Sequence, residues 1–154
     1  MVEGLERRQR EGELHFVTFS CFHRCGYLGS AAARDLFEEA LAKVGRSYRF
    51  DVVGYVVMPE HVHLLVSEPA RELLSVALQG LKLSVARRSK MSPFWLPRYY
   101  DFNVRTDAKR FEKLNYMHGN PIKRGLAERP EDWRRSSYRY YQTGVQGRVT
   151  IESS

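Results

Sequence analysis

The sequence lacks the features that mark membrane, secreted and disulfide-rich proteins. No run of about 18 apolar residues occurs, so no transmembrane helix is expected. The N-terminal stretch MVEGLERRQREGELHF is charged throughout and does not contain the apolar segment of a signal peptide. Cys21 and Cys25 are the only cysteines, too few for a disulfide framework. We therefore expect a reduced, cytoplasmic protein with no membrane partner.

The length and the charge distribution narrow the remaining classes. A chain of 154 residues with 43% hydrophobic content suits one domain over 1–154, with a core at about 14–142. Residues 1–80 hold nine Lys and Arg against eleven Asp and Glu, whereas residues 81–154 hold sixteen against seven. The net charge of +7 therefore comes from one half of the chain. Such a surplus indicates a basic face that suits a polyanion such as nucleic acid.

The order of predicted elements indicates an α+β fold. Aromatic and β-branched runs predict strands at 13–22, 49–58, 61–68 and 98–104. Helical spacing of apolar residues predicts helices at 31–44, with Ser30 as N-cap, at 71–90 and at 107–120, and a short last helix within 130–142. Pro121 is expected to end the third helix at Asn120. The order predicts a ferredoxin-like antiparallel sheet with helices on one face, the other face being free to carry a site.

Two histidines occupy unusual positions in the third predicted strand. The stretch VVMPEHVHLLVSEP, residues 56–69, places His61 and His63 one residue apart among valines and leucines. Because side chains alternate along a strand, both imidazoles leave the same face. Glu60, by the same alternation, is expected to point away from them.

Tyr116 stands on the polar side of the third helix. On a helical wheel Phe111, Leu114 and His118 form the opposite, buried stripe, and Asn120 lies one turn after the tyrosine. His118 is therefore interpreted as a hydrogen-bonded core histidine. The sequence pairs a tyrosine and an amide with the two histidines of the strand.

Four segments together resemble a known family. VMPEHVHLLVSEP, YYDFNV, YMHGNPIKRGL and PEDWRRSSYRYY, in this order, are similar to segments of the bacterial REP-associated tyrosine transposases. Those proteins and their insertion-sequence relatives are single-tyrosine HUH transposases. The resemblance runs from about Leu14 to Gln142, and the insertion-sequence relatives commonly carry glutamine where Asn120 stands.

The resemblance implies a reaction and a role for each residue. The fold would be an HUH nuclease fold whose tyrosine-bearing helix completes the site. Tyr116 would attack a DNA phosphodiester to give a covalent 5′-phosphotyrosine and a free 3′-hydroxyl. His61, His63 and Asn120 would hold a divalent metal, Mg²⁺ or Mn²⁺. The implied activity is that of a DNA transposase acting on single-stranded or hairpin DNA with REP-like repeats, as a monomer or homodimer.

Other interpretations of the histidine pair are considered beside this one. The two could be ordinary surface histidines. A zinc site would need Cys or His to complete four ligands, and Cys21 and Cys25 are interpreted as small hydrophobes. A two-histidine phosphodiesterase would need a second HxT or HxS motif, which the sequence does not contain.

Two functional classes stay open, an active nuclease and strand transferase or a catalytically silent repeat-DNA-binding or regulatory module of the same descent. In either class, cations would contact the DNA backbone. The candidates are Lys82, Arg87, Arg88, Arg98, Lys123, Arg124, Arg134 and Arg135.

Overall fold

A computed structural model describes residues 13–153. It contains a four-stranded antiparallel sheet in the order β2-β3-β1-β4, which confirms the predicted fold class. Within these residues no helix is both long and apolar enough to cross a membrane. The elements are β1 (Leu14–Ser20), η1 (Phe22–Arg24), α2 (Ala31–Tyr48), β2 (Val52–Val57), β3 (His61–Ser67), α3 (Leu74–Ser89), β4 (Tyr100–Val104), α4 (Asp107–Lys123), η2 (Pro130–Asp132) and α5 (Tyr138–Thr143).

The strand register brings distant parts of the chain to one end of the sheet. The end of β1 pairs with the start of β3, Ser20 opposite His61 and Thr18 opposite His63. Thr18 also lies opposite Tyr100, the first residue of β4. One end of the sheet therefore contains the start of β3, the end of β1 and the start of β4.

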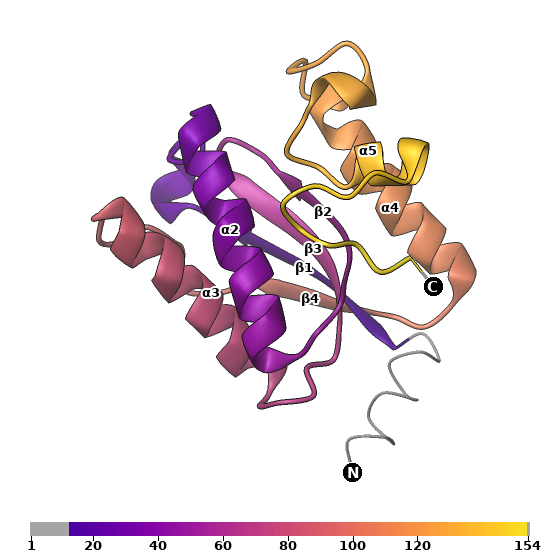
Figure 1. Ribbon diagram of the computed structural model, residues 1–154. Helices are drawn as coiled ribbons and strands as arrows, with labels where there is room; N and C mark the ends of the chain where they lie inside the picture. Colours follow the sequence, from indigo (N-terminus) through magenta and orange to yellow (C-terminus); the bar gives the residue numbers. More distant parts are fainter. Residues whose placement is uncertain (1–12, 154) are drawn as a thin grey trace.

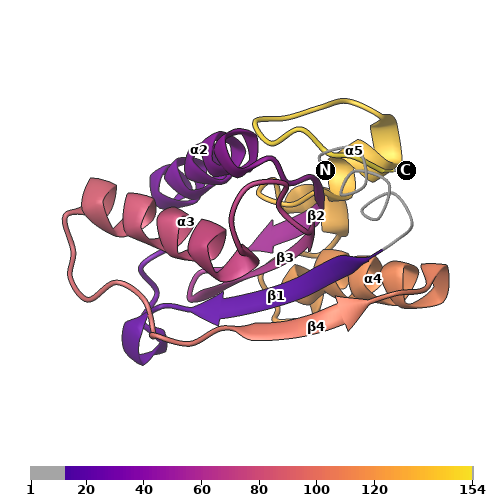
Figure 2. The ribbon, with the colours of Figure 1, turned by 90° about the horizontal axis from the view of Figure 1, so that it is seen from below.

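One face of the sheet is covered by α2 and α3 (Figures 1 and 2). Ser30 caps α2 as predicted, its hydroxyl accepting a hydrogen bond from the backbone N–H of Ala33 at 3.1 Å. The helix runs on to Tyr48, and Arg49 closes it in the left-handed conformation with φ of 56°. The core on this face includes Val17, Phe19, Phe37, Leu41, Val62, Leu64, Leu78 and Leu81.

The opposite face of the sheet carries α4, so the expectation that this face is free is wrong. Leu114 and Met117 of α4 are buried against strand residues including Phe16, Val56 and Leu65. Burying each of the two α4 side chains contributes about 2 kcal/mol. Only the end of the face, where the histidines lie, is left for a site.

The predicted end of α4 at Asn120 is also wrong, because the helix continues through Pro121 to Lys123. A proline this close to the end of a helix removes a single backbone donor. The backbone N–H of Arg124 still donates to the Asn120 carbonyl at 3.0 Å, and that of Leu126 to the Pro121 carbonyl at 2.8 Å. The additional turn carries Arg124 toward the start of β3.

Segments from the C-terminal part of the chain close the outer edge of β2. Val56 forms an antiparallel bridge with Ser136, and Val52 a parallel bridge with Ile151. The short helix α5 overlaps the second half of the predicted last helix, ends one residue beyond it, and joins these two contacts. The edge of β2 is therefore hydrogen-bonded near both of its ends.

Gly54 sets how closely α4 approaches the sheet, and its substitution tests this packing. A Cβ at Gly54 would lie 2.5 Å from Leu114 Cδ2 and 2.9 Å from Met117 Cε. We predict that Gly54→Ala lowers the free energy of unfolding by about 1 to 3 kcal/mol. Gly119→Ala in α4 is the control, since its Cβ meets nothing within 4 Å. That change should raise stability by up to about 1 kcal/mol through helix propensity. Urea unfolding measures both, and equal effects of the two substitutions would contradict the packing.

Candidate functional site

The two histidines of β3 converge as the alternation predicts. The Nε2 atoms of His61 and His63 lie 3.1 Å apart. Both side chains are buried, with 6% and 5% of their surface exposed. The ring of His63 stacks on Phe16 of β1 at a centroid distance of 5.4 Å. The β3 strand thus presents two close imidazoles toward the side of the sheet that α4 covers.

The second nitrogen of each imidazole has its own partner. Nδ1 of His61 lies 2.9 Å from Glu60 Oε1, and Nδ1 of His63 lies 2.7 Å from Thr18 Oγ1. Glu60 was expected to point away from the histidines, and that prediction is wrong. Pro59 and Glu60 form the turn before β3, where the alternation of a strand does not apply. With both Nδ1 atoms engaged, the Nε2 atoms are the ones that face each other.

Glu60 in turn connects β3 to the end of α4. Its Oε1 accepts a hydrogen bond from the Arg124 guanidinium at 2.5 Å. Burial alone would raise the pKa of Glu60, but the hydrogen bond from Arg124 and the neighbouring His61 hold it below its usual value. The carboxylate is therefore ionised at neutral pH. An ionised carboxylate favours a proton on Nδ1 of His61 and leaves the Nε2 lone pair free.

Both histidines are neutral at physiological pH. Burial lowers the pKa of His61, although Glu60 opposes this change. Burial, followed by the nearby His61 and Lys113, lowers the pKa of His63 to about 3. A neutral imidazole is the form that binds a metal ion.

Tyr116 stands over the histidines on the exposed side of α4. Its ring centroid lies 5.3 Å from that of His63 and 6.2 Å from that of Phe16, and 48% of its surface is exposed. The predicted buried stripe of this helix was only partly right. Phe111 is 63% exposed, and Met117 takes its place in the core. His118 is buried with Nε2 2.8 Å from Ser137 Oγ, which confirms it as a hydrogen-bonded core histidine.

Asn120 lies on α4 between Tyr116 and Arg124, the two residues through which this helix reaches the histidines of β3. Tyr116, Asn120 and Arg124 follow one another at intervals of one turn along the same side of the helix. Tyr116 contacts His63 through its ring, and Arg124 reaches His61 through Glu60. Asn120 itself is 6% exposed. The helical spacing therefore places Asn120 on the same side of α4 as Tyr116 and Arg124, at a buried position.

Within residues 13–153, no three His, Cys, Asp or Glu side chains gather into a metal-binding group. Cys21 is buried in the core, where burial raises the pKa of its thiol to about 12. A zinc site built with this cysteine is not formed.

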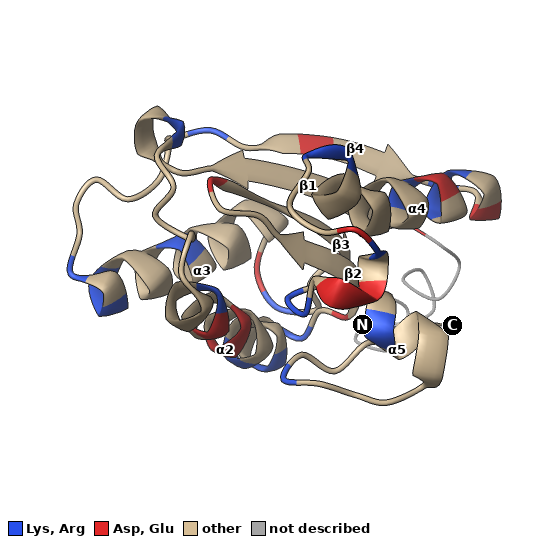
Figure 3. Cartoon of the chain, turned by 90° about the horizontal axis from the view of Figure 1, so that it is seen from above, with Lys and Arg blue, Asp and Glu red and all other residues tan. Residues whose placement is uncertain are grey.

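The predicted DNA-contacting cations occupy different environments. Lys82 is buried and donates to the Leu96 carbonyl at 2.9 Å, so its prediction as a DNA contact is wrong. Arg135 is bound to Asp35 and Arg88 to Glu39. Figure 3 shows Lys and Arg at the end of α3, in the connection to β4 and on α4. The exposed candidates are Arg87, Arg88, Arg98, Lys123, Arg124 and Arg134.

Four residues that surround the histidines are not among the site residues predicted from the sequence. These are Thr18, Arg24, Glu60 and Lys113. Lys113 Nζ lies 4.9 Å from the centre of the Phe16 ring, and the charge of Arg24 acts on His61. The alternation of β1 places Thr18 on the same face as Phe16, but pairing with His63 depends on a register that the sequence does not state.

Residues 9–113 match the family model for IS200-like transposases. The match includes His61 and His63 and ends before Tyr116. A REP-associated tyrosine transposase of Escherichia coli (strain K12) is 25% identical over 104 residues, which cover 67% of this chain and 63% of that protein. A relative from Haemophilus influenzae, named for the same group, is 26% identical over 117 residues and 66% of each chain. The matches thus span about two thirds of the length of these relatives.

A solved structure shares the fold. It is a REP-associated tyrosine transposase bound to a REP hairpin, and it superposes with a TM-score of 0.76. The likeness covers 94% of this chain and 88% of that one, at 22% sequence identity.

The low pKa of His63 can be measured directly. We predict that its imidazole resonances keep their neutral positions from pH 8 down to about pH 4 in NMR titrations. The unfolded chain takes up a proton at this residue near 6.5, but the folded chain does so only near 3. Acidification below 6.5 therefore costs stability, about 1.4 kcal/mol for each pH unit in this window. The urea-unfolded protein is the control, and an inflection of the folded protein near pH 6.5 would show that the imidazole is solvated.

Proposed function

The chain belongs to the IS200-like transposase family, and on this basis we propose that it is a metal-dependent endonuclease and strand transferase for single-stranded or hairpin DNA. The observation that carries the proposal is the pair of Nε2 atoms 3.1 Å apart with the Tyr116 ring beside them. It combines a place for a divalent ion with an exposed hydroxyl nucleophile. The solved relative bound to a REP hairpin supports DNA of this kind as the substrate.

Tyr116 supplies the nucleophile in this proposal. Its phenolic oxygen forms a bond to phosphorus as the bond to the leaving 3′-oxygen breaks, and the phenol proton is lost as the leaving oxygen gains one. The product is a 5′-phosphotyrosine and a free 3′-hydroxyl. The covalent bond keeps the phosphoryl group activated, so rejoining to another 3′-hydroxyl needs no ATP. Tyr116 is 48% exposed, which leaves its ring accessible to a DNA strand.

The residues around the histidines fit a divalent metal ion. If Glu60 and Thr18 accept the Nδ1 protons, the two Nε2 lone pairs face each other at 3.1 Å, an arrangement that a cation stabilises. His61 and His63 would hold the ion with Asn120 as the third ligand. The amide oxygen suits both Mg²⁺ and Mn²⁺, and the imidazole nitrogens favour Mn²⁺ over Mg²⁺. Such an ion supplies Lewis-acid polarisation of the scissile phosphate.

Glu60 and Arg124 position this site. The carboxylate fixes the orientation of the His61 ring, and the guanidinium fixes the carboxylate. Arg24, Arg98 and Arg124 belong to segments at the same end of the sheet as the histidines, where they would meet the DNA backbone. Contacts with phosphates would orient the strand relative to Tyr116.

The alternative function is a silent module that binds repeat DNA without cutting it. The complete set of His61, His63, Tyr116 and Asn120, with both histidines neutral, favours the enzyme. A protein kept only for binding would not need a neutral imidazole pair next to an exposed tyrosine.

Tyr116→Phe separates the two functions, because it removes the nucleophilic oxygen and keeps the ring. We predict that DNA binding changes less than about twofold, while cleavage and the covalent adduct fall to background. Wild-type and variant proteins are incubated with labelled hairpin oligonucleotides and Mn²⁺, denatured and separated by electrophoresis. Tyr100→Phe, an exposed tyrosine of β4, is the matched control and should keep full activity.

Two outcomes of this experiment would count against the proposal. A Tyr116→Phe protein that still links to DNA would assign the nucleophile to another residue. A wild-type protein that binds a broad set of hairpins and links to none would establish the silent module.

A further inference from the structure

A cavity of about 380 Å³ lies at the outer edge of β2, apart from the histidines. Most residues of the segments 134–140 and 145–151 line it, and Tyr55 of β2 and Glu38 of α2 complete it. These are the segments that bond the two ends of β2 through Ser136 and Ile151. The volume falls at the small end of the roughly 300 to 1,000 Å³ that ligand pockets occupy. The space is large enough for one nucleotide.

The lining of the cavity carries an excess of positive charge. Arg134, Arg135, Arg139 and Arg148 all contribute to it. Arg135 and Arg148 share the single carboxylate of Asp35. Nη2 of Arg135 lies 2.5 Å and Nη1 of Arg148 lies 2.9 Å from Asp35 Oδ1. Within residues 13–153, neither the Arg134 nor the Arg139 guanidinium forms an ion pair with an acidic side chain. Two guanidinium groups at the rim are therefore available for an anion.

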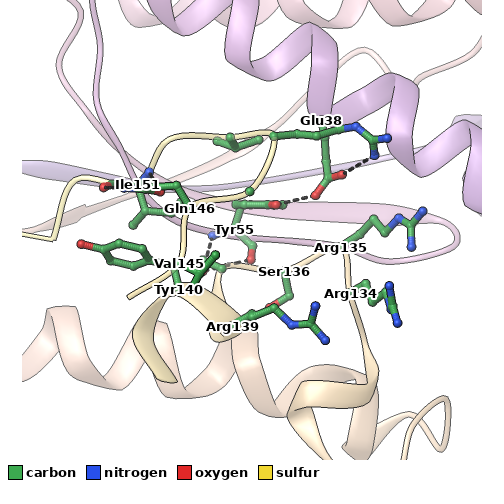
Figure 4. A pocket seen from close by; sticks show the side chains of 14 residues that line it. Glu38, Tyr55, Arg134, Arg135, Ser136, Arg139, Tyr140, Val145, Gln146 and Ile151 are labelled. Carbon is green, nitrogen blue, oxygen red and sulfur yellow. Dashed lines mark hydrogen bonds and ion pairs between the residues drawn. The ribbon is translucent and has the colours of Figure 1, made fainter. Parts of the chain in front are cut away.

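A buried acceptor lies opposite the arginines. The Glu38 side chain is 6% exposed and accepts a short hydrogen bond from the Tyr55 hydroxyl. The other oxygen of Glu38, Oε1, is 3.7 Å from Arg148 Nη1. Figure 4 shows Glu38 at the top of the cavity, Arg134, Arg135 and Arg139 to the right and below, and Tyr140, Gln146 and Ile151 to the left. Arg134 and Arg139 are exposed, whereas Glu38 is buried. A ligand that enters here meets cations first and a carboxylate deeper inside.

We propose that this cavity binds one phosphate-bearing nucleotide. The phosphate would lie at the rim on Arg134 and Arg139, as guanidinium groups bind phosphate oxygens with paired hydrogen bonds. The base would enter toward Glu38, whose carboxylate accepts hydrogen bonds from the N–H groups of the base. An inorganic anion would bind only the two arginines, and a neutral base would form hydrogen bonds only with Glu38. A nucleotide would interact with the arginines through its phosphate and with Glu38 through its base.

The nucleotide has two sources, an unpaired residue of bound DNA or a free mononucleotide. For the first source the inference rests on the proposed function, because DNA must already occupy the protein. For the second source it is independent of the histidines and Tyr116. Both share the same chemistry, and the experiment separates them.

The first arm uses free ligands in metal-free buffer. Deoxyadenosine monophosphate, deoxyribose 5-phosphate and inorganic phosphate are titrated by calorimetry and by two-dimensional amide NMR. We expect the nucleotide to bind at least fivefold more tightly than deoxyribose phosphate. Its amide shifts should map to residues 134–140 and 145–151 and leave His61 and His63 unchanged. Shifts centred on the histidines, or equal affinities for all three ligands, would overturn the assignment for a free nucleotide.

Two variants test the phosphate contact and the base contact separately. Arg134→Ala combined with Arg139→Ala should weaken binding of the nucleotide at least tenfold, since charge-assisted hydrogen bonds are lost. Glu38→Gln should remove only the preference for the nucleotide over deoxyribose phosphate. Arg71→Ala combined with Arg105→Ala removes the same charge from exposed positions outside the cavity and is the control.

The second arm uses hairpin oligonucleotides with and without one unpaired terminal nucleotide, bound by Tyr116→Phe protein. If DNA is the source, the unpaired nucleotide should raise affinity at least fivefold, and the double arginine variant should abolish this gain. No gain here, together with no mapped binding of the free nucleotide, would refute the proposal. If the protein binds DNA but does not cleave it, the proposed function is wrong. The nucleotide-binding result is unaffected, because both arms measure binding and neither measures cleavage.

Discussion

The close approach of α4 to the sheet is the constraint on which the site depends. The helix can lie against β2 because position 54 has no side chain, and Leu114 and Met117 fill the space above it. From this position the helix reaches the histidines of β3 with Tyr116 and, two turns later, with Arg124. A shift of the helix by one side chain would separate the tyrosine from His63 while leaving the sheet intact.

The same contact explains why the histidines are neutral. The helix and Phe16 remove water from His63, and burial lowers its pKa to about 3. At His61, the Glu60 carboxylate opposes part of the pKa decrease that burial causes. Arg124 in turn lowers the pKa of Glu60, which burial alone would raise. The Arg124–Glu60 ion pair therefore connects the end of α4 to the neutral imidazole pair. Such a network orients the histidines before any ion or DNA arrives.

Much of this arrangement could be predicted from the sequence, because it follows local periodicity. The alternation of a strand brings His61 and His63 to one face, and the order of elements predicts the antiparallel sheet of a ferredoxin-like fold. The expectations that failed depend on contacts and turns that the periodicity of the sequence does not show. Lys82 looks like a surface cation until the Leu96 carbonyl is seen beside it, and Pro121 looks like a helix end until contacts beyond it hold the next turn. Glu60 was assigned by strand alternation although it belongs to a turn.

A direct test of the proposed metal site is calorimetric titration of the protein with Mn²⁺. One ion per chain should bind the wild type, His63→Ala should lose this binding, and His23→Ala, which removes an exposed histidine outside the site, should keep it. The same preparations are assayed for cleavage of a hairpin oligonucleotide with and without EDTA. We predict that binding and cleavage disappear together in His63→Ala, and that EDTA stops cleavage by the wild type. Full cleavage in EDTA, or unchanged Mn²⁺ binding by His63→Ala, would contradict it.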